Sequence, residues 1–230
     1  MSKQHLKRLN APKSWPISRK GTKWVTRQNP GTHDLESSIP INIMLKDMLK
    51  YAKTTRDVKR ILNNKEILID NIPRTDIKFS VGIFDLIEIP KTKEHFLLLL
   101  NKKGKLFPKK IDEKKAELKH IKIIGKTVLK KGKFQVNFNN GNNMIMNKKD
   151  YNIGDTLIIN LKDKKIVKHI KLQKGVMVYL TKGKHVGETG SLENIPKLEN
   201  TKNNLVELKI NDKIVNTLKD YIFVVDKDLI

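Results

Sequence analysis

Positive charge is the feature that most constrains how this chain can fold, because Lys and Arg outnumber Asp and Glu two to one. The sequence carries 48 Lys and Arg against 24 Asp and Glu, which gives a formal net charge of +24 at pH 7. Self-repulsion of this size destabilises a compact state unless a partner supplies negative charge. Nucleic acid is the commonest such partner, and an anionic membrane surface is the other.

The excess charge is confined to two segments. Residues 1–33 carry a net charge of +8 and residues 91–174 carry +16, whereas residues 34–90 and 175–230 are each neutral. A charged surface that only maintained solubility would not need this separation. The distribution favours two cationic regions that bind a polyanion, each followed by a neutral module.

The first 33 residues should not fold by themselves. Pro12, Pro16 and Pro30 interrupt every helical register, and the few apolar residues fall on no sustained face. Because this stretch contains no Asp or Glu, we expect an extended arm that is disordered in the free protein and ordered only on RNA. The candidate RNA-binding residues of the arm are Lys3, His5, Lys7, Arg8, Lys13, Trp15, Arg19, Lys20, Lys23, Trp24 and Arg27.

Two tryptophans, Trp15 and Trp24, lie among these cations. This mixture suits a segment that neutralises phosphates and stacks on bases. Either ring could instead anchor the arm on the protein's own surface. The sequence leaves both interpretations open.

Composition excludes several mechanisms. Without cysteine there is no disulfide framework, no thiolate zinc site and no cysteine nucleophile. The six histidines are spread singly, so we expect no metal site, and we expect His5, His33 and His185 to face RNA or solvent and His95, His120 and His169 to pack or face solvent. No apolar run approaches the roughly 18 residues that span a bilayer, and no secretory leader follows the cationic start. A cytoplasmic protein is therefore expected.

The triplet Gly125-Lys126-Thr127 resembles the end of a phosphate-binding loop. Such a loop also needs a glycine five residues before Gly125, where this chain has His120. It further requires a strand that leads into a helix, whereas the residues after Thr127 are β-rich. We expect no nucleotide site here.

Residues 37–53 read as a helix. Ser37 or Ser38 can cap it, and Pro40 suits its first turn. One apolar stripe at helical spacing is formed by Ile41, Met44, Leu45, Met48 and Leu49.

A second, shorter helix should begin at Thr54 or Thr55. It places an apolar side opposite a cationic one. The apolar side is Val58, Ile61 and Leu62, and the cationic side is Arg56, Lys59 and Arg60. Two β-rich runs then flank a predicted turn at residues 71–73.

Strand-turn-strand patterns dominate residues 94–173. Cationic residues 102–104 separate two apolar runs, and turns are predicted at residues 140–141 and 163–165. These patterns predict a small barrel or rolled sheet whose turns carry lysine. The candidate RNA-binding residues of this region are Lys102, Lys103 and Lys105.

The last 57 residues contain four or five short strands and a loop with three glycines, which suits an SH3-like barrel. The predicted fold class is α+β, mostly β. The predicted segments are a basic extended N-terminal arm (1–36), a small α/β domain (37–93), a central β domain (94–173) and a C-terminal barrel (174–230).

Several stretches resemble the S4e family of archaeal and eukaryotic small-subunit ribosomal proteins. They are HLKRLNAPKSW at 5–15, GTHDLESSIPINIMLKDMLKYA at 31–52, the turn at 74–76, and the glycine-spaced loop at 183–190. The resemblance covers nearly the whole chain. It implies a basic arm, an S4-type RNA-binding domain, a central β domain and a terminal KOW motif in an SH3-like barrel, all docked on small-subunit ribosomal RNA.

The resemblance also implies roles for individual residues. The S4-type motif falls on Arg56, Lys59, Arg60 and Arg74, which should contact RNA phosphates. The KOW pattern falls on Lys182, Gly183, Gly187 and Gly190, with Lys184 and His185 on the same loop. The chain lacks the basic C-terminal extension of the eukaryotic relatives, which favours an archaeal source.

The function that this implies is that of a structural constituent of the small ribosomal subunit. It would bind and stabilise small-subunit ribosomal RNA beside neighbouring ribosomal proteins, with no catalytic step, no cofactor, no membrane and no small-molecule substrate. A free-standing RNA-binding regulator or an assembly factor stays open as the alternative. A modifying enzyme is disfavoured, because no unassigned stretch is long enough for a catalytic domain, although any fold can pair two carboxylates.

Overall fold

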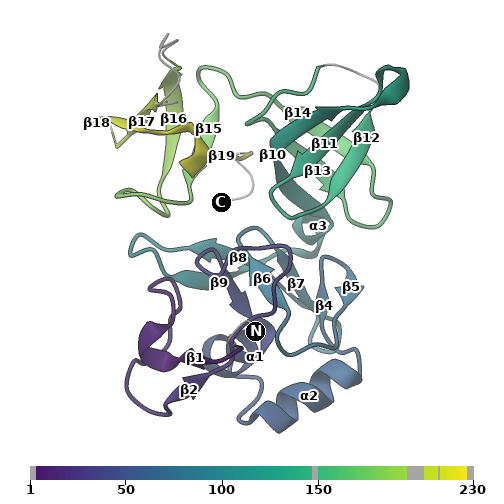
Figure 1. Cartoon of the computed structure of the whole chain (residues 1–230), viewed down its shortest axis with the longest axis vertical. Helices are drawn as coiled ribbons and strands as arrows, with labels where there is room; N and C mark the ends of the chain where they lie inside the picture. Colours follow the sequence, from purple (N-terminus) through teal and green to yellow (C-terminus); the bar gives the residue numbers. More distant parts are fainter. Residues whose placement is uncertain (1–3, 147–149, 196–204, 212, 227–230) are drawn as a thin grey trace. The chain divides into compact units, whose positions relative to one another are not determined.

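The structure, a computed structural model, describes residues 4–146, 150–195, 205–211 and 213–226. Two compact units divide the chain, the first formed by residues 1–100 and 104–119 and the second by residues 101–103 and 120–230. Strands dominate both units and the helices are few and short, so the fold is α+β and mostly β, as predicted (Figure 1).

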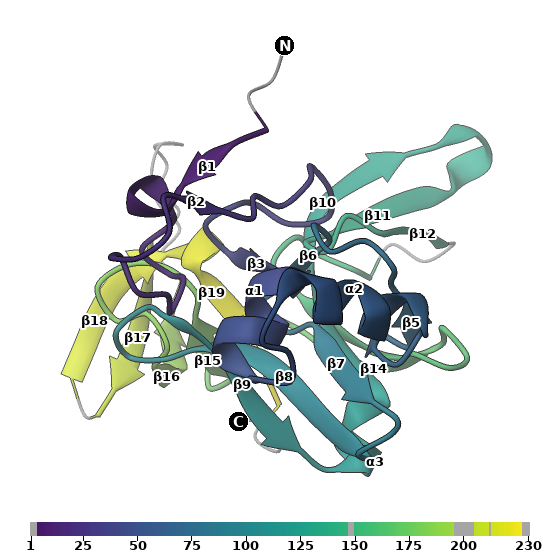
Figure 2. The same cartoon turned by 90° about the horizontal axis from the view of Figure 1, so that it is seen from below.

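The first unit contains three antiparallel sheets and most of the helical residues. Its strands are β1 (Leu6–Lys7), β2 (Trp24–Val25), β3 (Ser38–Pro40), β4 (Leu68–Ile69), β5 (Ile72–Pro73), β6 (Ser80–Gly82), β7 (Leu86–Ile89), β8 (Glu94–Leu100) and β9 (Leu106–Ile111). Its helices are η1 (Arg8–Asn10), α1 (Ile41–Ile43), η2 (Met44–Met48), α2 (Thr55–Asn63) and α3 (Glu113–Ala116). The main sheet has the order β5-β4-β7-β8-β9, with α1 and α2 on one face (Figures 1 and 2).

The boundary expected after residue 93 falls inside this sheet. β8 pairs with β7, with Leu86 opposite Leu97, and β9 pairs with β8 in turn. The strand-turn-strand prediction for this hairpin is confirmed, but the two strands belong to the first unit and not to the central β domain. The prediction placed the boundary where the strand-turn-strand pattern begins, at residue 94, and a local pattern does not show which strands pair in a sheet.

The first predicted helix is wrong at its start. Ser38 caps no helix, because Ser38–Pro40 forms β3 and pairs with β6, with Ser38 opposite Gly82. A single α turn follows, and η2 is a π-helix in which the amide of Leu49 donates to the carbonyl of Met44, 2.9 Å away. The apolar stripe is confirmed for its first half, since Ile41, Met44 and Leu45 are fully buried.

The second predicted helix is confirmed together with its cap. The Thr54 hydroxyl accepts from the amide of Asp57 at 3.2 Å, and the Asp57 carboxylate accepts from the amide of Thr54 at 2.9 Å. This reciprocal capping satisfies two amides that the first turn leaves without partners. Val58 and Leu62 are buried beneath the helix.

The turn predicted at residues 71–73 lies one residue earlier. Asp70 and Asn71 have φ values of 53° and 62°, and they form the two-residue loop between β4 and β5. Both residue types tolerate the left-handed conformation that such hairpin loops require. Pro73 belongs to β5, an edge strand, where its missing amide costs no sheet hydrogen bond.

The N-terminal arm packs on the first unit, so the expectation of a disordered, extended segment is wrong for its described residues. Trp15 is only 1% exposed, and its indole nitrogen donates to the carbonyl of Ser38 at 2.7 Å. One residue earlier, the carbonyl of Ser14 accepts from the amide of Leu106 at 2.8 Å. The arm is therefore fixed between β3 and β9.

Two arginines hold the arm in its folded path. Arg19 donates to the carbonyls of Leu9, Ala11 and Pro12 at 3.1, 2.7 and 3.1 Å. Arg8 donates to the carbonyls of Ser18 and Thr22 at 3.0 and 3.1 Å. These side chains supply hydrogen bonds to backbone carbonyls that have no partner in a helix or a sheet. A search for hydrophobic periodicity in the sequence does not detect such contacts.

The second unit contains two five-stranded sheets. The first has the order β12-β11-β10-β13-β14 and the second β18-β17-β16-β15-β19. Their strands are β10 (Leu118–Val128), β11 (Phe134–Phe138), β12 (Asn143–Met146), β13 (Thr156–Asn160), β14 (Ile166–Ile170), β15 (Met177–Leu180), β16 (Thr189–Asn194), β17 (Leu205–Ile210), β18 (Lys213–Leu218) and β19 (Ile222–Val224), with the short helices η3 (Lys130–Gly132) and η4 (Lys219–Tyr221). The turns predicted at residues 140–141 and 163–165 are confirmed, as are five strands after residue 174.

Each sheet of the second unit has its own apolar core. One core includes Ile123, Val136 and Phe138, and the other includes Val178 and Leu208. Lys122 on β10 links the two sheets, because its ammonium donates to the carbonyls of Lys219, Asp220 and Ile222 at 3.2, 3.1 and 2.7 Å.

His120, also on β10, is buried without a hydrogen-bond partner for either ring nitrogen among the described residues. Burial lowers the pKa of His120 from 6.5 to about 4. The ring is therefore neutral in the folded protein at neutral pH.

Replacing Trp15 with Ala should destabilise the first unit by about 3–5 kcal/mol, because the substitution empties a buried aromatic site. Chemical denaturation, followed by far-ultraviolet circular dichroism, measures the loss. Trp24 is the matched control, since it is 51% exposed, and Trp24→Ala should change stability by no more than about 0.5 kcal/mol. Equal losses in the two variants would contradict an anchoring role for Trp15.

His120 should make the second unit less stable as pH falls from about 6.5 to about 4. In this window the unfolded chain binds a proton on His120 and the folded chain does not. The free energy of unfolding therefore decreases as the pH is lowered, by on the order of 3 kcal/mol. Amide hydrogen exchange in β11 reports this unit. His120→Leu should abolish this part of the pH dependence, and an identical pH dependence in both proteins would contradict it.

Candidate nucleic-acid interface

The two-stranded ribbon of β1 and β2 carries exposed cations around an aromatic ring. Lys7 lies opposite Trp24 in the register, and both are exposed. The ring centroids of His5 and Trp24 are 5.5 Å apart, and the Lys23 ammonium lies 5.2 Å from the centroid of Trp24. These four predicted site residues are brought together on one ribbon.

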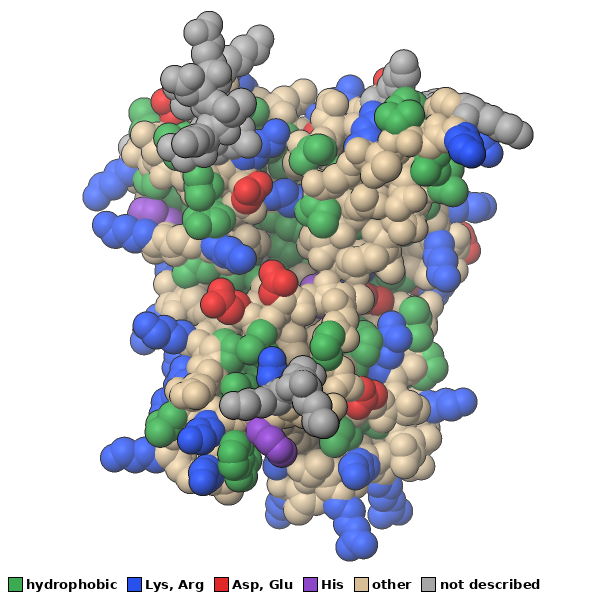
Figure 3. All heavy atoms as spheres, viewed as in Figure 1, with side chains coloured by type: hydrophobic (Ala, Val, Ile, Leu, Met, Phe, Trp, Pro, Cys, Tyr) green, Lys and Arg blue, Asp and Glu red, His purple; other side chains and the backbone are tan. Residues whose placement is uncertain are grey.

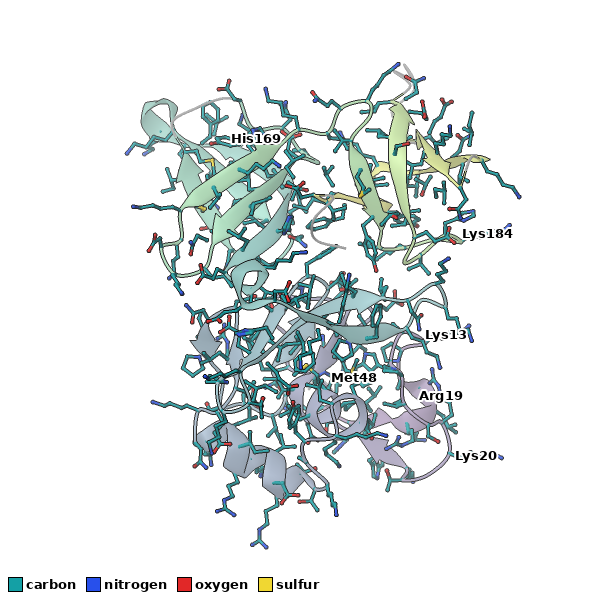
Figure 4. All side chains as sticks on the ribbon, turned by 180° about the vertical axis from the view of Figure 1, so that it is seen from behind. Lys13, Arg19, Lys20, Met48, His169 and Lys184 are labelled. Atoms are coloured by element: carbon teal, nitrogen blue, oxygen red, sulfur yellow. The ribbon has the colours of Figure 1, made fainter. Side chains whose placement is uncertain are left out.

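The other arm residues divide into exposed and internal ones. Lys13 and Lys20 are exposed, and Figure 4 shows them on the arm together with Arg19. Trp15 is buried, and the half-buried Arg8 and Arg19 hold the arm in its folded path, so the predicted contact of these residues with RNA competes with a structural role. Lys3 lies outside the described residues.

Arg27 lines a small open pocket at the base of the arm. The pocket is also lined by Gln4, Gln28, Asn29, Pro30, His33, Leu35 and Lys78. Two cations and several amides facing one hollow make this part of the arm suited to an anionic group. Composition identified Arg27 as a candidate, but sequence reasoning missed Lys78, which lies distant in the chain and carries no local motif.

Helix α2 presents its predicted cationic side to solvent. Arg56, Lys59 and Arg60 are all exposed, with Arg56 on the first turn. The guanidinium of Arg74, on the segment after β5, stacks on Phe79 at 4.3 Å from the ring centroid. Stacking fixes the plane of this guanidinium, and its Nε has no hydrogen-bond partner among the described residues.

The β8–β9 turn and the loop before β16 carry the remaining predicted cations. Lys102 and Lys103 are exposed on the turn, where Gly104 adopts a φ of 70°, and Lys105 follows at the start of the returning segment. Lys182 and Lys184 are exposed on the loop, and Figure 4 shows Lys184 at its outer side.

Glycines shape this second loop for reasons internal to the protein. Gly183 and Gly187 have φ values of 91° and 78°, which favour glycine. A Cβ on Gly190 would lie 2.8 Å from both the carbonyl of Lys209 and the side chain of Ile210. His185 is partly held by the protein, because its Nδ1 lies 3.0 Å from the carboxylate of Glu188.

A buried ion cluster joins the arm to the first unit, and sequence reasoning missed it. His33, expected to face RNA or solvent, is instead enclosed, and its Nε2 lies 2.9 Å from the carboxylate of Asp85. The ammonium of Lys119 contacts the same carboxylate at 2.6 Å and also pairs with Asp70. Gly82 makes room for the imidazole, because a Cβ there would overlap the ring of His33.

The cluster favours the charged forms of Asp85 and Lys119, whereas burial and the charge of Asp85 raise the pKa of Asp70. Burial alone would raise the pKa of Asp85, but Lys119 and His33 hold it well below its usual range. Burial alone would lower the pKa of Lys119, but the carboxylates of Asp85 and Asp70 raise it above its ordinary value. Lys119 therefore stays charged inside the protein and is excluded from an RNA-contacting surface.

The described part of the chain has no arrangement of residues that would bind a nucleotide phosphate or a metal ion, or that would cross a bilayer as a helix. Residues 125–127 lie within strand β10, with Lys126 stacked 4.6 Å from the ring centroid of Phe134, so the phosphate-loop interpretation stays rejected. No group of three or more described His, Asp or Glu side chains could hold a metal ion. No described helix combines the length and apolarity that crossing a bilayer requires.

Several acids pair with surface lysines, whereas many of the predicted contact cations are exposed and form no such pair. Glu66, Glu94 and Asp226 pair with Lys91, Lys110 and Lys168 on the surface. Among the described residues, no ion pair is formed by the cations Lys13, Lys20, Arg56, Lys59, Arg60, Lys102, Lys103, Lys182 and Lys184. Figure 3 shows Lys and Arg side chains projecting over both units, with fewer acids between them.

Comparison with known proteins identifies relatives along the whole chain. Residues 92–166 match the model of the ribosomal family S4e, and residues 2–36 match that of the RS4NT (NUC023) domain. The small ribosomal subunit protein eS4 of Methanosphaera stadtmanae is 42% identical over 99% of this chain and 94% of its own length. That of Archaeoglobus fulgidus is 38% identical over 99% of this chain and 95% of its own.

A solved structure extends this likeness to the fold. The crystal structure of the 30S ribosomal protein S4e from Thermoplasma acidophilum matches with a TM-score of 0.72 and 29% sequence identity, over 82% of this chain and 95% of that one. Sequence similarity and fold similarity thus both extend over most of the chain. The chain therefore belongs to the ribosomal S4e family.

Proposed function

We propose that this protein is a structural constituent of the small ribosomal subunit, which binds and stabilises small-subunit ribosomal RNA in the cytoplasm. The observation that carries the proposal is its 42% identity, over 99% of the chain, to a small ribosomal subunit protein. The role requires no catalytic step and no cofactor. Its partners are ribosomal RNA and the neighbouring proteins of the subunit.

Each part of the chain has a role in this proposal. The arm and the helical part of the first unit, with α2 as an S4-type motif, bind RNA through their exposed cations. The lysine-bearing turn at residues 102–104 and the hairpins of the central β region add further contacts. The strands after residue 174 form an SH3-like domain whose loop at 182–190 is the KOW motif.

Electrostatics supplies the binding energy in this proposal. RNA phosphates hold a condensed layer of counterions, and each lysine or arginine that replaces one of them releases it to solvent. The cations Arg56, Lys59, Arg60, Lys102, Lys103, Lys182 and Lys184 are suited to this exchange, because they are exposed and form no ion pair with an acid among the described residues. The internal ion pairs do not take part.

Co-sedimentation tests the proposal as a whole. In lysates of the cells that make it, this protein should migrate with the small subunit through a sucrose gradient and stay there after a high-salt wash that strips loosely bound factors. Immunoblotting of the fractions measures this. Release by the salt wash would favour an assembly factor, and sedimentation at the top of the gradient in both buffers would favour a free-standing regulator.

The cationic side of α2 should contribute to the salt dependence of RNA binding. The triple variant Arg56→Gln, Lys59→Gln, Arg60→Gln should reduce the slope of log affinity against log salt by about 0.7–0.9 for each phosphate that the variant no longer neutralises. Binding to small-subunit ribosomal RNA, measured across a salt series, gives the slope.

A second triple variant controls for net charge. Lys91→Gln, Lys110→Gln, Lys168→Gln removes the same formal charge from side chains that pair with acids. It should leave the slope closer to that of the unmodified protein. If both triple variants lower the slope equally, α2 makes no specific contact and only the total charge matters.

A further inference from the structure

Trp24 is the exposed member of the chain's two tryptophans. It is 51% exposed, whereas Trp15 is 1% exposed. Tryptophan is highly buried on average in folded proteins, so an indole that lies half exposed on the surface calls for a physical reason. Nothing in the stability of the first unit supplies one, because the ring does not belong to its core.

The pleat of the ribbon determines which way the ring faces. Leu6 lies opposite Val25, and both are half-buried, whereas Lys7 lies opposite Trp24, and both are exposed. Successive side chains of a strand point to opposite faces. The ribbon therefore packs Leu6 and Val25 against the protein and turns Trp24 outward.

The surroundings of the ring select its ligand. The His5 ring is tilted by 48° to the indole at 5.5 Å, and the ammonium of Lys23 lies 5.2 Å from its centroid. Lys7 lies on the paired strand, and residues 1–33 contain no acid. An apolar plane framed by cations fits a flat, uncharged group that is attached to an anion.

We infer that Trp24 is a stacking site for one unpaired base of RNA, flanked by His5, with Lys7 and Lys23 against the adjoining phosphates. The inference rests on the proposed function and adds the chemical class of the nucleotide. A base inside a duplex offers its face only to its neighbours, so the ligand belongs to a loop, a bulge or a single strand. An apolar protein partner would bury the ring but would have to desolvate the cations around it.

Two variants of the full chain test the inference. Trp24→Leu keeps an apolar side chain but removes the aromatic face, and Trp24→Phe keeps a smaller face. The probes are a short mixed-sequence single-stranded RNA and an RNA duplex of the same length. Trp24→Leu should weaken binding of the single strand about 5- to 150-fold and leave binding of the duplex unchanged, with Trp24→Phe in between.

Intrinsic fluorescence gives a direct readout. Stacking should quench the emission of Trp24 when the single strand is added, and this quenching should be absent from Trp24→Leu, which retains only the buried Trp15. Both probes are measured at the same salt concentration, because the phosphate contacts depend on salt.

The outcomes separate this inference from the proposed function. If Trp24→Leu and the unmodified protein bind the single strand equally, or if the variant loses equal affinity for strand and duplex, the inference is wrong while RNA binding stands. If the unmodified protein binds neither RNA, the proposed function itself fails. If the variant binds naked RNA normally but docks poorly on subunits lacking this protein, Trp24 faces a protein neighbour and the inference is overturned.

Discussion

The first unit depends on one buried ammonium group. Lys119 stands at the start of β10 and pairs with two carboxylates, Asp85 before β7 and Asp70 in the β4–β5 loop. Asp85 in turn holds His33, so the cluster ties the arm to the sheet. Removing one partner of such a cluster would leave an uncompensated charge in the interior, which is far more costly than losing a surface pair. The arm and the sheet of the first unit are therefore coupled through a few polar contacts.

The same arrangement explains how a chain with a net charge of +24 can fold and still bind a polyanion. Some of the acids stabilise the fold, in the buried cluster, in the cap of α2 and in local surface pairs. Other cations face solvent on α2, on the β8–β9 turn and on the loop before β16. Compactness and affinity for phosphate thus use different charges of one chain, and the proposed ribosomal role requires both.

Local sequence signals predicted what local interactions build. The cap of α2 needs only Thr54 and Asp57, and the hairpin turn at residues 140–141 needs only an Asn-Gly pair. Errors arose where the partner is remote: Ser38 pairs with Gly82 in a sheet, Trp15 is anchored by Ser38, and His33 packs on Gly82. Among the site residues, exposed cations followed from composition, whereas the internal use of Arg8, Arg19 and Trp15 required the tertiary contacts.

A growing chain releases the arm long before the strand that completes its docking. Leu106, which donates to Ser14, follows it by 92 residues, so at about 5 to 20 residues per second roughly 5 to 20 s of synthesis separate the two. During this interval the eight cations of residues 1–33 have no finished protein surface to pack on. Docking of the arm is then a late step in the folding of the first unit, in competition with any RNA near the tunnel exit. Slow synthesis across residues 38–106 would lengthen that exposure.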